Sequence, residues 1–159
     1  MRVALGADHA GFPLKEFVRN ELESLGHEVI DCGTQSEQPV DFPDITAITC
    51  ARVIAGDADR GVLVCGTGAG AIMAANKIDG IRCALTHEPY SAHQAVEHDD
   101  ANMIAMGAWL VPRALVHDIL ERFLTATFDD DADTVRRVGK LDRLERESLD
   151  VYLESPPLA

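Results

Sequence analysis

Short apolar runs alternate with stretches of helical periodicity about five times along this chain, and no linker interrupts the alternation. The apolar runs that we expect to be strands are residues 2–7, 27–31, 61–65, 81–85 and 103–106. Helices are expected between and after them, over residues 14–25, 45–54, 69–76, 88–98 and 112–123. Such an alternation indicates a parallel sheet covered by helices. We therefore predict an α/β fold, a three-layer α/β/α sandwich with a five-stranded parallel, Rossmann-like sheet.

A last amphipathic segment, residues 135–144, follows the acidic run of Asp129–Asp131 and Asp133. We interpret the acidic run as a solvated loop that also places negative charge at a helix N-terminus, where the helix dipole favours it. No strand follows to receive this last helix, so we expect it to pack on a neighbouring subunit. Residues 1–149 are then a single domain, and residues 150–159 a flexible tail.

The 159 residues carry a formal net charge of −13, which argues against a nucleic-acid partner because such partners require a basic face. No apolar stretch approaches the roughly 20 residues needed to span a membrane, and the N-terminus lacks the pattern of a signal peptide. The four cysteines, at positions 32, 50, 65 and 83, include no close pair of the kind that binds zinc. We expect a reduced, cytoplasmic protein without a structural zinc.

The most informative segment, residues 61–70, reads Gly-Val-Leu-Val-Cys-Gly-Thr-Gly-Ala-Gly. A buried strand would deliver Cys65, Thr67 and several free backbone amides to its carboxyl end, where open α/β sheets bind ligands. The loop is neither a P-loop nor a dinucleotide fingerprint, so a plain tight turn is the alternative. Cys65 is either a small buried apolar residue or a thiolate favoured by the donor-rich loop. The other three cysteines lack this setting, and we expect them to be structural.

Asp8 and His9 stand where the first strand becomes the first helix, so both should face the same sheet edge as Cys65. The alternative for Asp8 is a helix N-cap. His98 lies in a polar turn before the fifth strand and could move a proton near neutral pH. A base, a hydroxyl, an oxyanion loop and an imidazole are the groups that aldose–ketose isomerisation through an enediolate requires.

Several motifs in the same order resemble the family of ribose-5-phosphate isomerase B and galactose-6-phosphate isomerase, over about residues 1 to 149. They are Gly6-Ala-Asp-His-Ala-Gly11, Asp41-Phe-Pro43, Cys65-Gly-Thr-Gly-Ala-Gly70, Ala74-Ala-Asn-Lys77, Glu88-Pro-Tyr-Ser-Ala92 and His98-Asp-Asp-Ala-Asn102.

The resemblance implies a metal-free isomerase of a small sugar or sugar phosphate. It also implies a homodimer or homotetramer in which a neighbouring subunit completes each site. Cys65 would be the base that moves the proton, and His98 would help to open the sugar ring with assistance from Asp8. Thr67 and the loop amides would hold the enediolate oxygens, while His9 would be a ligand on the phosphate side. The remaining substrate-binding positions are Gly66, Gly68, Ala69, Gly70, Phe42, Asp99 and Arg137.

The chain departs from the family pattern mainly at the phosphate end. It has Gly107-Ala-Trp109 where the family usually has Gly-x-Arg, and only Arg137 survives from the usual Arg-His-x-x-Arg of the last helix. In that helix Asp133 stands where it would repel a phosphate dianion. Asp99 replaces the usual asparagine, and Phe42 a common tyrosine. Because arginine binds phosphate through charged, bidentate hydrogen bonds, these changes predict an altered specificity, for another short sugar phosphate or an unphosphorylated sugar.

Two other functions remain open on the sequence alone. A non-catalytic module on the same fold could bind a sugar or an anion without moving a carbon-bound proton. A cysteine hydrolase would require a thiol–imidazole pair at Cys65.

Overall fold

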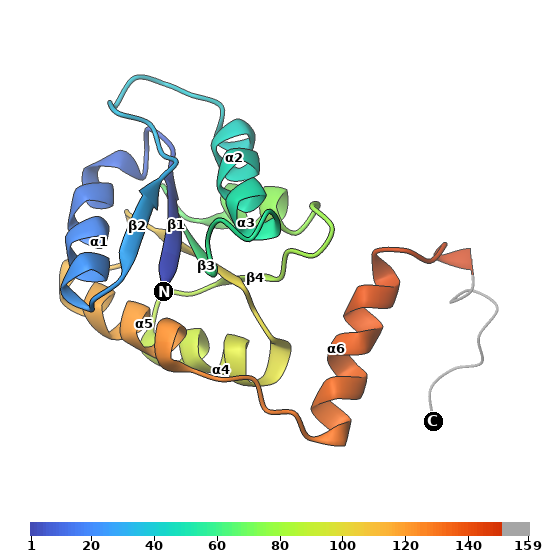
Figure 1. Ribbon diagram of the computed structural model, residues 1–159. Helices are drawn as coiled ribbons and strands as arrows, with labels where there is room; N and C mark the ends of the chain where they lie inside the picture. The colour runs from blue at the N-terminus through green and yellow to red at the C-terminus, as the bar shows by residue number, and fades with distance from the viewer. Residues whose placement is uncertain (151–159) are drawn as a thin grey trace. The chain divides into compact units, whose positions relative to one another are not determined.

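The computed structural model describes residues 1–150, which divide into two compact units, Met1–Phe128 and the chain from Asp129 onward. The first unit contains a five-stranded sheet with five helices around it (Figure 1). The strands are β1 (Arg2–Ala7), β2 (Glu28–Asp31), β3 (Arg60–Cys65), β4 (Cys83–Leu85) and β5 (Met103–Gly107). Their order is β2-β1-β3-β5-β4, and every neighbouring pair is parallel. The predicted fold class is confirmed.

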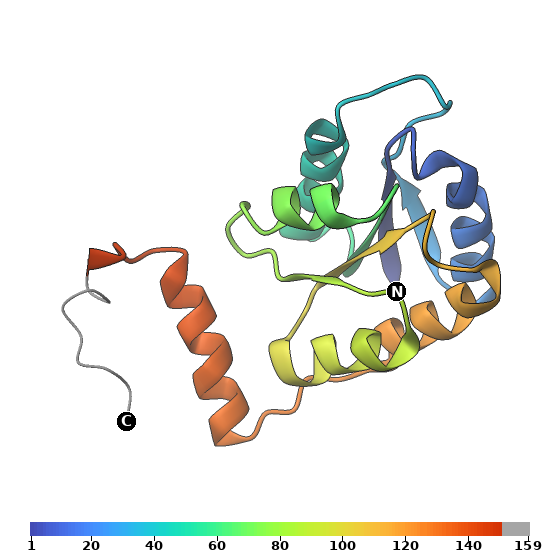
Figure 2. The ribbon, with the colours of Figure 1, turned by 180° about the vertical axis from the view of Figure 1, so that it is seen from behind.

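Helices cover both faces of the sheet and bury its apolar side chains. They are α1 (Phe12–Ser24), α2 (Phe42–Ile54), α3 (Ala69–Ala75), α4 (Pro89–Asp99) and α5 (Arg113–Thr125). One core lies between the sheet and α1, α4 and α5, and includes Leu5, Val18 and Phe123. A smaller core lies between the sheet and α2 and α3, and includes Leu63 and Met103 (Figure 2). β3, at the centre of the sheet, is buried on both faces from Gly61 to Val64, as its uniformly apolar sequence predicts.

The boundaries of most elements differ by one to three residues from the sequence prediction, and two of these differences have a local cause. α2 begins at Phe42 rather than at residue 45, with Pro43 in its first turn, where the missing N–H of proline costs no helical hydrogen bond. β4 begins at Cys83 rather than at residue 81, because the Ile81 amide donates to the Ile78 carbonyl in a turn before the chain enters the sheet.

Two polar side chains fix segments next to the sheet. Lys15 of α1 is buried, and its Nζ donates to Asp31 Oδ2 and to the Thr34 carbonyl, both at 2.8 Å. This ion pair holds the start of the long loop after β2 against α1. Asn76, at the end of α3, pairs its side-chain amide with the backbone N–H and C=O of Cys83, each at 2.8 Å. It thereby covers backbone groups of β4, a strand at the edge of the sheet that would otherwise be open to another chain.

The second unit contains the helix α6 (Ala132–Leu144). As predicted from the acidic run, Asp131 caps this helix, and its Oδ1 accepts from the amides of Asp133 (2.7 Å) and Thr134 (3.1 Å). Of the tail predicted over residues 150–159, all but Asp150 lies outside the described residues. No helix among residues 1–150 is long and apolar enough to cross a bilayer.

Candidate active site

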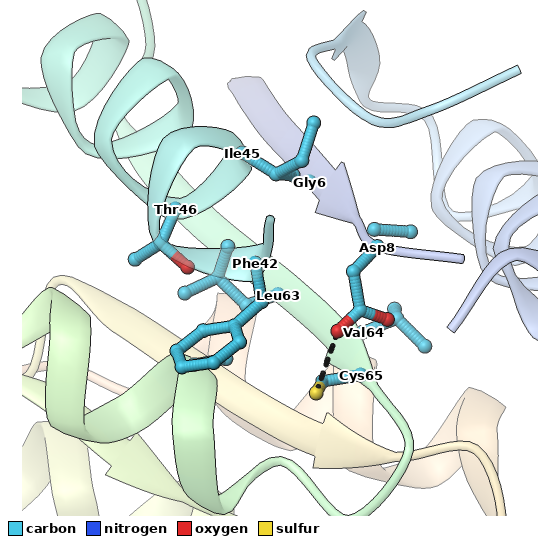
Figure 3. Close-up of a pocket in the computed structure, with 10 residues that line it drawn as sticks. Gly6, Asp8, Phe42, Ile45, Thr46, Leu63, Val64 and Cys65 are labelled. Carbon is cyan, nitrogen blue, oxygen red and sulfur yellow. Dashed lines mark hydrogen bonds between the residues drawn. The ribbon is translucent and has the colours of Figure 1, made fainter. Parts of the chain in front are cut away.

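A thiol and a carboxylate meet at the carboxyl edge of the sheet, between β1 and β3. These strands are neighbours, with Ala7 in register with Val64, so Asp8 and Cys65 leave the sheet side by side. The Cys65 thiol donates to Asp8 Oδ2, with the sulfur 2.8 Å from the oxygen (Figure 3). From β1 the chain proceeds to β2 on one side of the pair, and from β3 it proceeds to β4 and β5 on the other side. The pair therefore lies at the topological switch point of the sheet, where α/β proteins bind ligands.

Asp8 is held by a second hydrogen bond. Its carboxylate is 5% exposed, and Oδ1 accepts from the Gly11 amide at 2.8 Å in the turn that leads into α1. Asp8 is therefore not the N-cap of α1, which is Gly11. One carboxylate oxygen of Asp8 fixes the turn before the helix, and the other accepts from the Cys65 thiol.

The environment of Cys65 keeps its thiol protonated. Burial raises the pKa of Cys65, and the hydrogen bond and negative charge of Asp8 raise it further. The backbone amides of Gly66 and Gly68 act in the opposite direction but are outweighed. Of the two alternatives for Cys65, the thiolate favoured by the donor-rich loop is thus not supported, because the loop amides do not lower the pKa of Cys65 on balance.

Replacing Asp8 with asparagine should lower the pKa of Cys65, because the change removes a negative charge beside the sulfur. The rate of iodoacetamide alkylation at Cys65, followed by mass spectrometry against pH, measures this midpoint. Asp57→Asn is the matched control, since Asp57 pairs with Arg52 in the exposed turn after α2 and should leave the midpoint unchanged. An unchanged or raised midpoint in Asp8→Asn would contradict the assignment of the Asp8–Cys65 pair.

The glycine-rich loop after Cys65 is fixed by close contacts that only glycines permit. Gly68 has φ +82°, a left-handed conformation that favours glycine, and it precedes the first turn of α3. A Cβ on Gly66 would lie 2.8 Å from the Trp109 ring, and one on Gly70 would lie 3.1 Å from the Phe42 ring. Thr67, between the glycines, is exposed, and its hydroxyl oxygen is 3.4 Å from the Ala69 amide. Thr67 and Ala69 of this loop are thus exposed beside the thiol, whereas Gly66 and Gly68 are buried.

The hollow beneath Cys65 is too small for a sugar. It is lined by Asp8, Cys65 and apolar side chains of α2, β3 and α3, among them Phe42, Ile45 and Leu63 (Figure 3). Its volume of about 10 Å³ admits at most one water molecule. A substrate must therefore lie above this hollow, on the outer side of the loop, where Thr67 and Phe42 are exposed.

His9 is oriented by the loop after β2. The Val40 amide donates to His9 Nδ1 at 3.2 Å, so Nδ1 is the acceptor and Nε2 carries the proton. His9 can then offer an Nε2–H donor to a ligand.

Two of the remaining predicted site residues, His98 and Asp99, do not join Cys65 within the chain. His98 and Asp99 are the last two residues of α4, which ends where the chain enters β5 (Figure 2). Met103, at the start of β5, is in register with Gly61, whereas Cys65 is in register with Gly107 at the other end of the strand. His98 and Asp99 therefore lie at the opposite edge of the sheet. Arg137 lies on α6 in the second unit, with its guanidinium 3.5 Å from Asp133.

The turn that carries His98 and Asp99 is held by its own polar network. Asp100 adopts a left-handed conformation with φ 49°, and its carboxylate pairs with Arg82 at 2.5 Å. The side chain of Asn102 accepts from the Arg82 amide and donates to the Gly80 carbonyl. Asp100 and Asn102 thus have structural roles, and they fix a turn from which His98 and Asp99 are exposed.

At the carboxyl edge of the sheet, where Cys65 lies, residues 1–150 form neither a thiol–imidazole pair nor a cluster of metal-binding side chains. Cys65 is hydrogen-bonded to a carboxylate and not to the imidazole that a cysteine hydrolase requires. The one group of metal-capable side chains in the described part, that of His117, Asp118 and Glu121, is exposed on α5, and His117 is bonded to Glu21 at 2.9 Å.

The fold and the site together define a class: a parallel α/β enzyme with a thiol–carboxylate pair and a glycine-rich loop at the switch point, a set suited to proton transfer beside a developing oxyanion. The model of the Ribose/Galactose Isomerase family matches residues 3–141, and the chain belongs to this family. The predicted enzyme class, an aldose–ketose isomerase, and the predicted family are thereby confirmed.

Individual relatives differ in the sugar that their names give. The chain is 40% identical over 128 residues to ribose-5-phosphate isomerase B of Escherichia coli, which covers 80% of this chain and 86% of the relative. It is 36% identical over 138 residues to 4-deoxy-4-sulfo-D-erythrose isomerase of a Clostridium species, which covers 86% of this chain and 87% of that relative. The structure of ribose-5-phosphate isomerase B from Clostridium thermocellum superimposes with a TM-score of 0.88 at 40% identity, covering 92% and 98% of the two chains.

Proposed function

We propose that this protein interconverts the aldose and ketose forms of a short sugar that carries an anionic group, through an enediolate formed at Cys65. The observation that carries the proposal is the Asp8–Cys65 hydrogen bond of 2.8 Å beside a loop of glycines. Relatives that are 40% and 36% identical to it over the aligned residues act, by their names, on a pentose phosphate and on a sulfonated tetrose. Both substrates are short sugars with a tetrahedral oxyanion at the end opposite the carbonyl group.

In the proposed reaction Cys65 is the base and Asp8 is its proton acceptor. The thiol proton passes to Asp8 Oδ2, and the thiolate removes the proton from carbon 2 of the open-chain aldose. The electron pair of that C–H bond moves to form the carbon–carbon double bond, and the carbonyl oxygen becomes the enediolate oxygen. Thr67 and the amides of Gly66, Gly68, Ala69 and Gly70 stabilise this oxygen. Cys65 then returns the proton to carbon 1, while the proton of the carbon-2 hydroxyl moves to the oxygen on carbon 1, which yields the ketose. The proton held by Asp8 then goes back to the Cys65 sulfur.

We also propose that a second copy of the chain completes the site, in a homodimer or homotetramer. His98 and Asp99 lie at the sheet edge opposite Cys65 and are exposed, so they can serve a sugar only at the site of another copy. There His98 would open the sugar ring and Asp99 would contact the substrate. Exposed apolar side chains beside the edge strand, Met73 at 63% and Tyr90 at 70%, offer surface for such contacts. A cytoplasmic location is in keeping with four cysteines that are all free.

The test is a screen of phosphorylated, sulfonated and free tetroses, pentoses and hexoses in deuterated water. Aldose–ketose conversion, with deuterium incorporated at carbon 1 or carbon 2, is the expected result. A clear preference for ribose 5-phosphate would refute the altered specificity but not the reaction. Binding of a sugar without any carbon-bound exchange would refute the reaction and favour the alternative, a non-catalytic sugar- or anion-binding module on the same fold.

A further inference from the structure

A cleft of about 210 Å³ opens at the carboxyl edge of the sheet, between the start of α1 and the turn after β5. Its lining includes Ala10, Leu14, Trp109 and Arg113. A water molecule occupies about 30 Å³ in the liquid, so the cleft has room for a group about seven waters in size. Unlike the hollow beneath Cys65, it can therefore hold the end of a small molecule.

This cleft shares its walls with the proposed active site. Ala10 follows Asp8 by two residues, on the same turn. On the other side, the Trp109 amide donates to the Gly66 carbonyl at 3.0 Å, and the Ala108 amide donates to the Cys65 carbonyl at 2.8 Å. The Trp109 ring also lies directly on Gly66. A molecule with its reactive end at Cys65 can thus extend past Trp109 into the cleft.

Arg113 is a cation in this cleft, and it has no anionic partner among the described residues 1–150. Its guanidinium lies 5.2 Å from the centroid of the Phe17 ring, which holds the planar group by a cation–π contact. No carboxylate pairs with it among residues 1–150, although the chain has 27 acidic and 14 basic residues other than histidine. Other arginines, such as Arg19, Arg52 and Arg143, do form ion pairs.

The helix dipole of α5 does not stabilise the positive charge of Arg113 either. Arg113 is the first residue of α5, and the helix dipole disfavours a cation at that end. The same dipole, together with the free amides of the first turn, favours an anion there. An oxyanion in the cleft would therefore complement both the guanidinium and the helix end.

We infer that Arg113 is a specificity-determining residue that binds the anionic end of the substrate, with the Trp109 ring as the wall between that end and the reacting carbons. This inference rests on the proposed isomerase function. The group that the cleft recognises is a tetrahedral oxyanion, a phosphate or a sulfonate. Within residues 1–150 the Arg113 guanidinium pairs with no carboxylate. Its planar N–H donors can therefore bind two oxygens of such an anion at once.

The test compares Arg113→Gln with wild type in two independent measurements. In the first, KM for ribose 5-phosphate or for 4-deoxy-4-sulfo-D-erythrose, whichever is turned over, should rise about 10- to 100-fold with kcat nearly unchanged. In the second, calorimetric binding of inorganic phosphate or methanesulfonate should weaken to a similar extent, and the anion that loses more identifies the natural group. Arg113→Lys, which keeps the charge without the planar fork, should fall between the two proteins. Arg122→Gln is the matched control on the same helix and should resemble wild type in both measurements.

The two proposals fail separately. A wild-type enzyme that isomerises a charged sugar, with an Arg113→Gln variant of unchanged KM and unchanged anion affinity, would overturn the role of Arg113 and leave the isomerase function intact. Turnover of uncharged sugars alone would also overturn it. Conversely, loss of anion binding in Arg113→Gln, in a protein that turns over no sugar, would support the anion-binding cleft and refute the isomerase function.

Discussion

Replacing Cys65 with alanine should lower kcat by about 10²–10⁴-fold, the range that a positioned general base contributes. The same variant should lose the incorporation of solvent deuterium at carbon 2, because no other thiol lies next to Asp8 in the described part of the chain. Substrate binding should persist, since the loop amides and the cleft are formed by other residues. The measurements are steady-state kinetics and deuterium exchange followed by NMR.

Cys32→Ala is the control for this experiment. Cys32 is half-buried in the loop after β2, and its thiol lies 3.5 Å from the Ile30 carbonyl, so its removal should leave kcat within about two-fold of wild type. Burial raises the pKa of Cys50 to about 11 and that of Cys83 to about 12. Within the described residues neither thiol is hydrogen-bonded to a carboxylate that could accept its proton, as Asp8 can for Cys65. Retained turnover in Cys65→Ala would refute the role of Cys65 as the base.

The sheet and its helices could be predicted because local patterns and tertiary packing agree. The uniformly apolar run of β3 requires cover on both faces, and the glycines after it forbid the strand to continue. The sequence does not fix the start of α2, since Pro43 is compatible with both a loop and a first helical turn. In the folded chain the Phe42 ring lies close to Gly70, a neighbour that the local sequence does not reveal. β4 has three residues and one partner, so little sequence pattern marks its start.

The sequence predicts which site residues lie together only where it shows the end of the strand, and thus the edge of the sheet, that each residue follows. Asp8 and Cys65 follow neighbouring parallel strands, which places them at one edge. The position of His98 follows from the same rule, since a crossover helix returns the chain to the opposite edge before the next parallel strand begins. The raised pKa of Cys65 depends on burial and on the contact with Asp8, and neither has a signal in the sequence. The contact of Trp109 with Gly66 likewise appears only in the folded chain.

Gly11→Ala should destabilise the protein by about 3 kcal/mol or more, because the added methyl group would clash with the backbone of β3. Its Cβ would lie 2.0 Å from the Val64 carbonyl oxygen and 2.9 Å from the Cys65 amide nitrogen, and both are backbone atoms at the centre of the sheet. Urea unfolding measures the loss. Any folded fraction should also have lower kcat, since relief of the clash requires the turn of Asp8 to move away from Cys65.

Gly139→Ala separates this effect from the general effect of a methyl group on a glycine. Gly139 lies in α6, and a Cβ there would meet no atom within 4 Å, so alanine should leave stability unchanged or raise it by about 0.5–1 kcal/mol. Wild-type stability in Gly11→Ala would show that the turn between β1 and α1 can move without cost. In that case the 2.8 Å contact between Asp8 and Cys65 would not be fixed by the fold, and the geometry on which the proposed proton transfer depends would be lost.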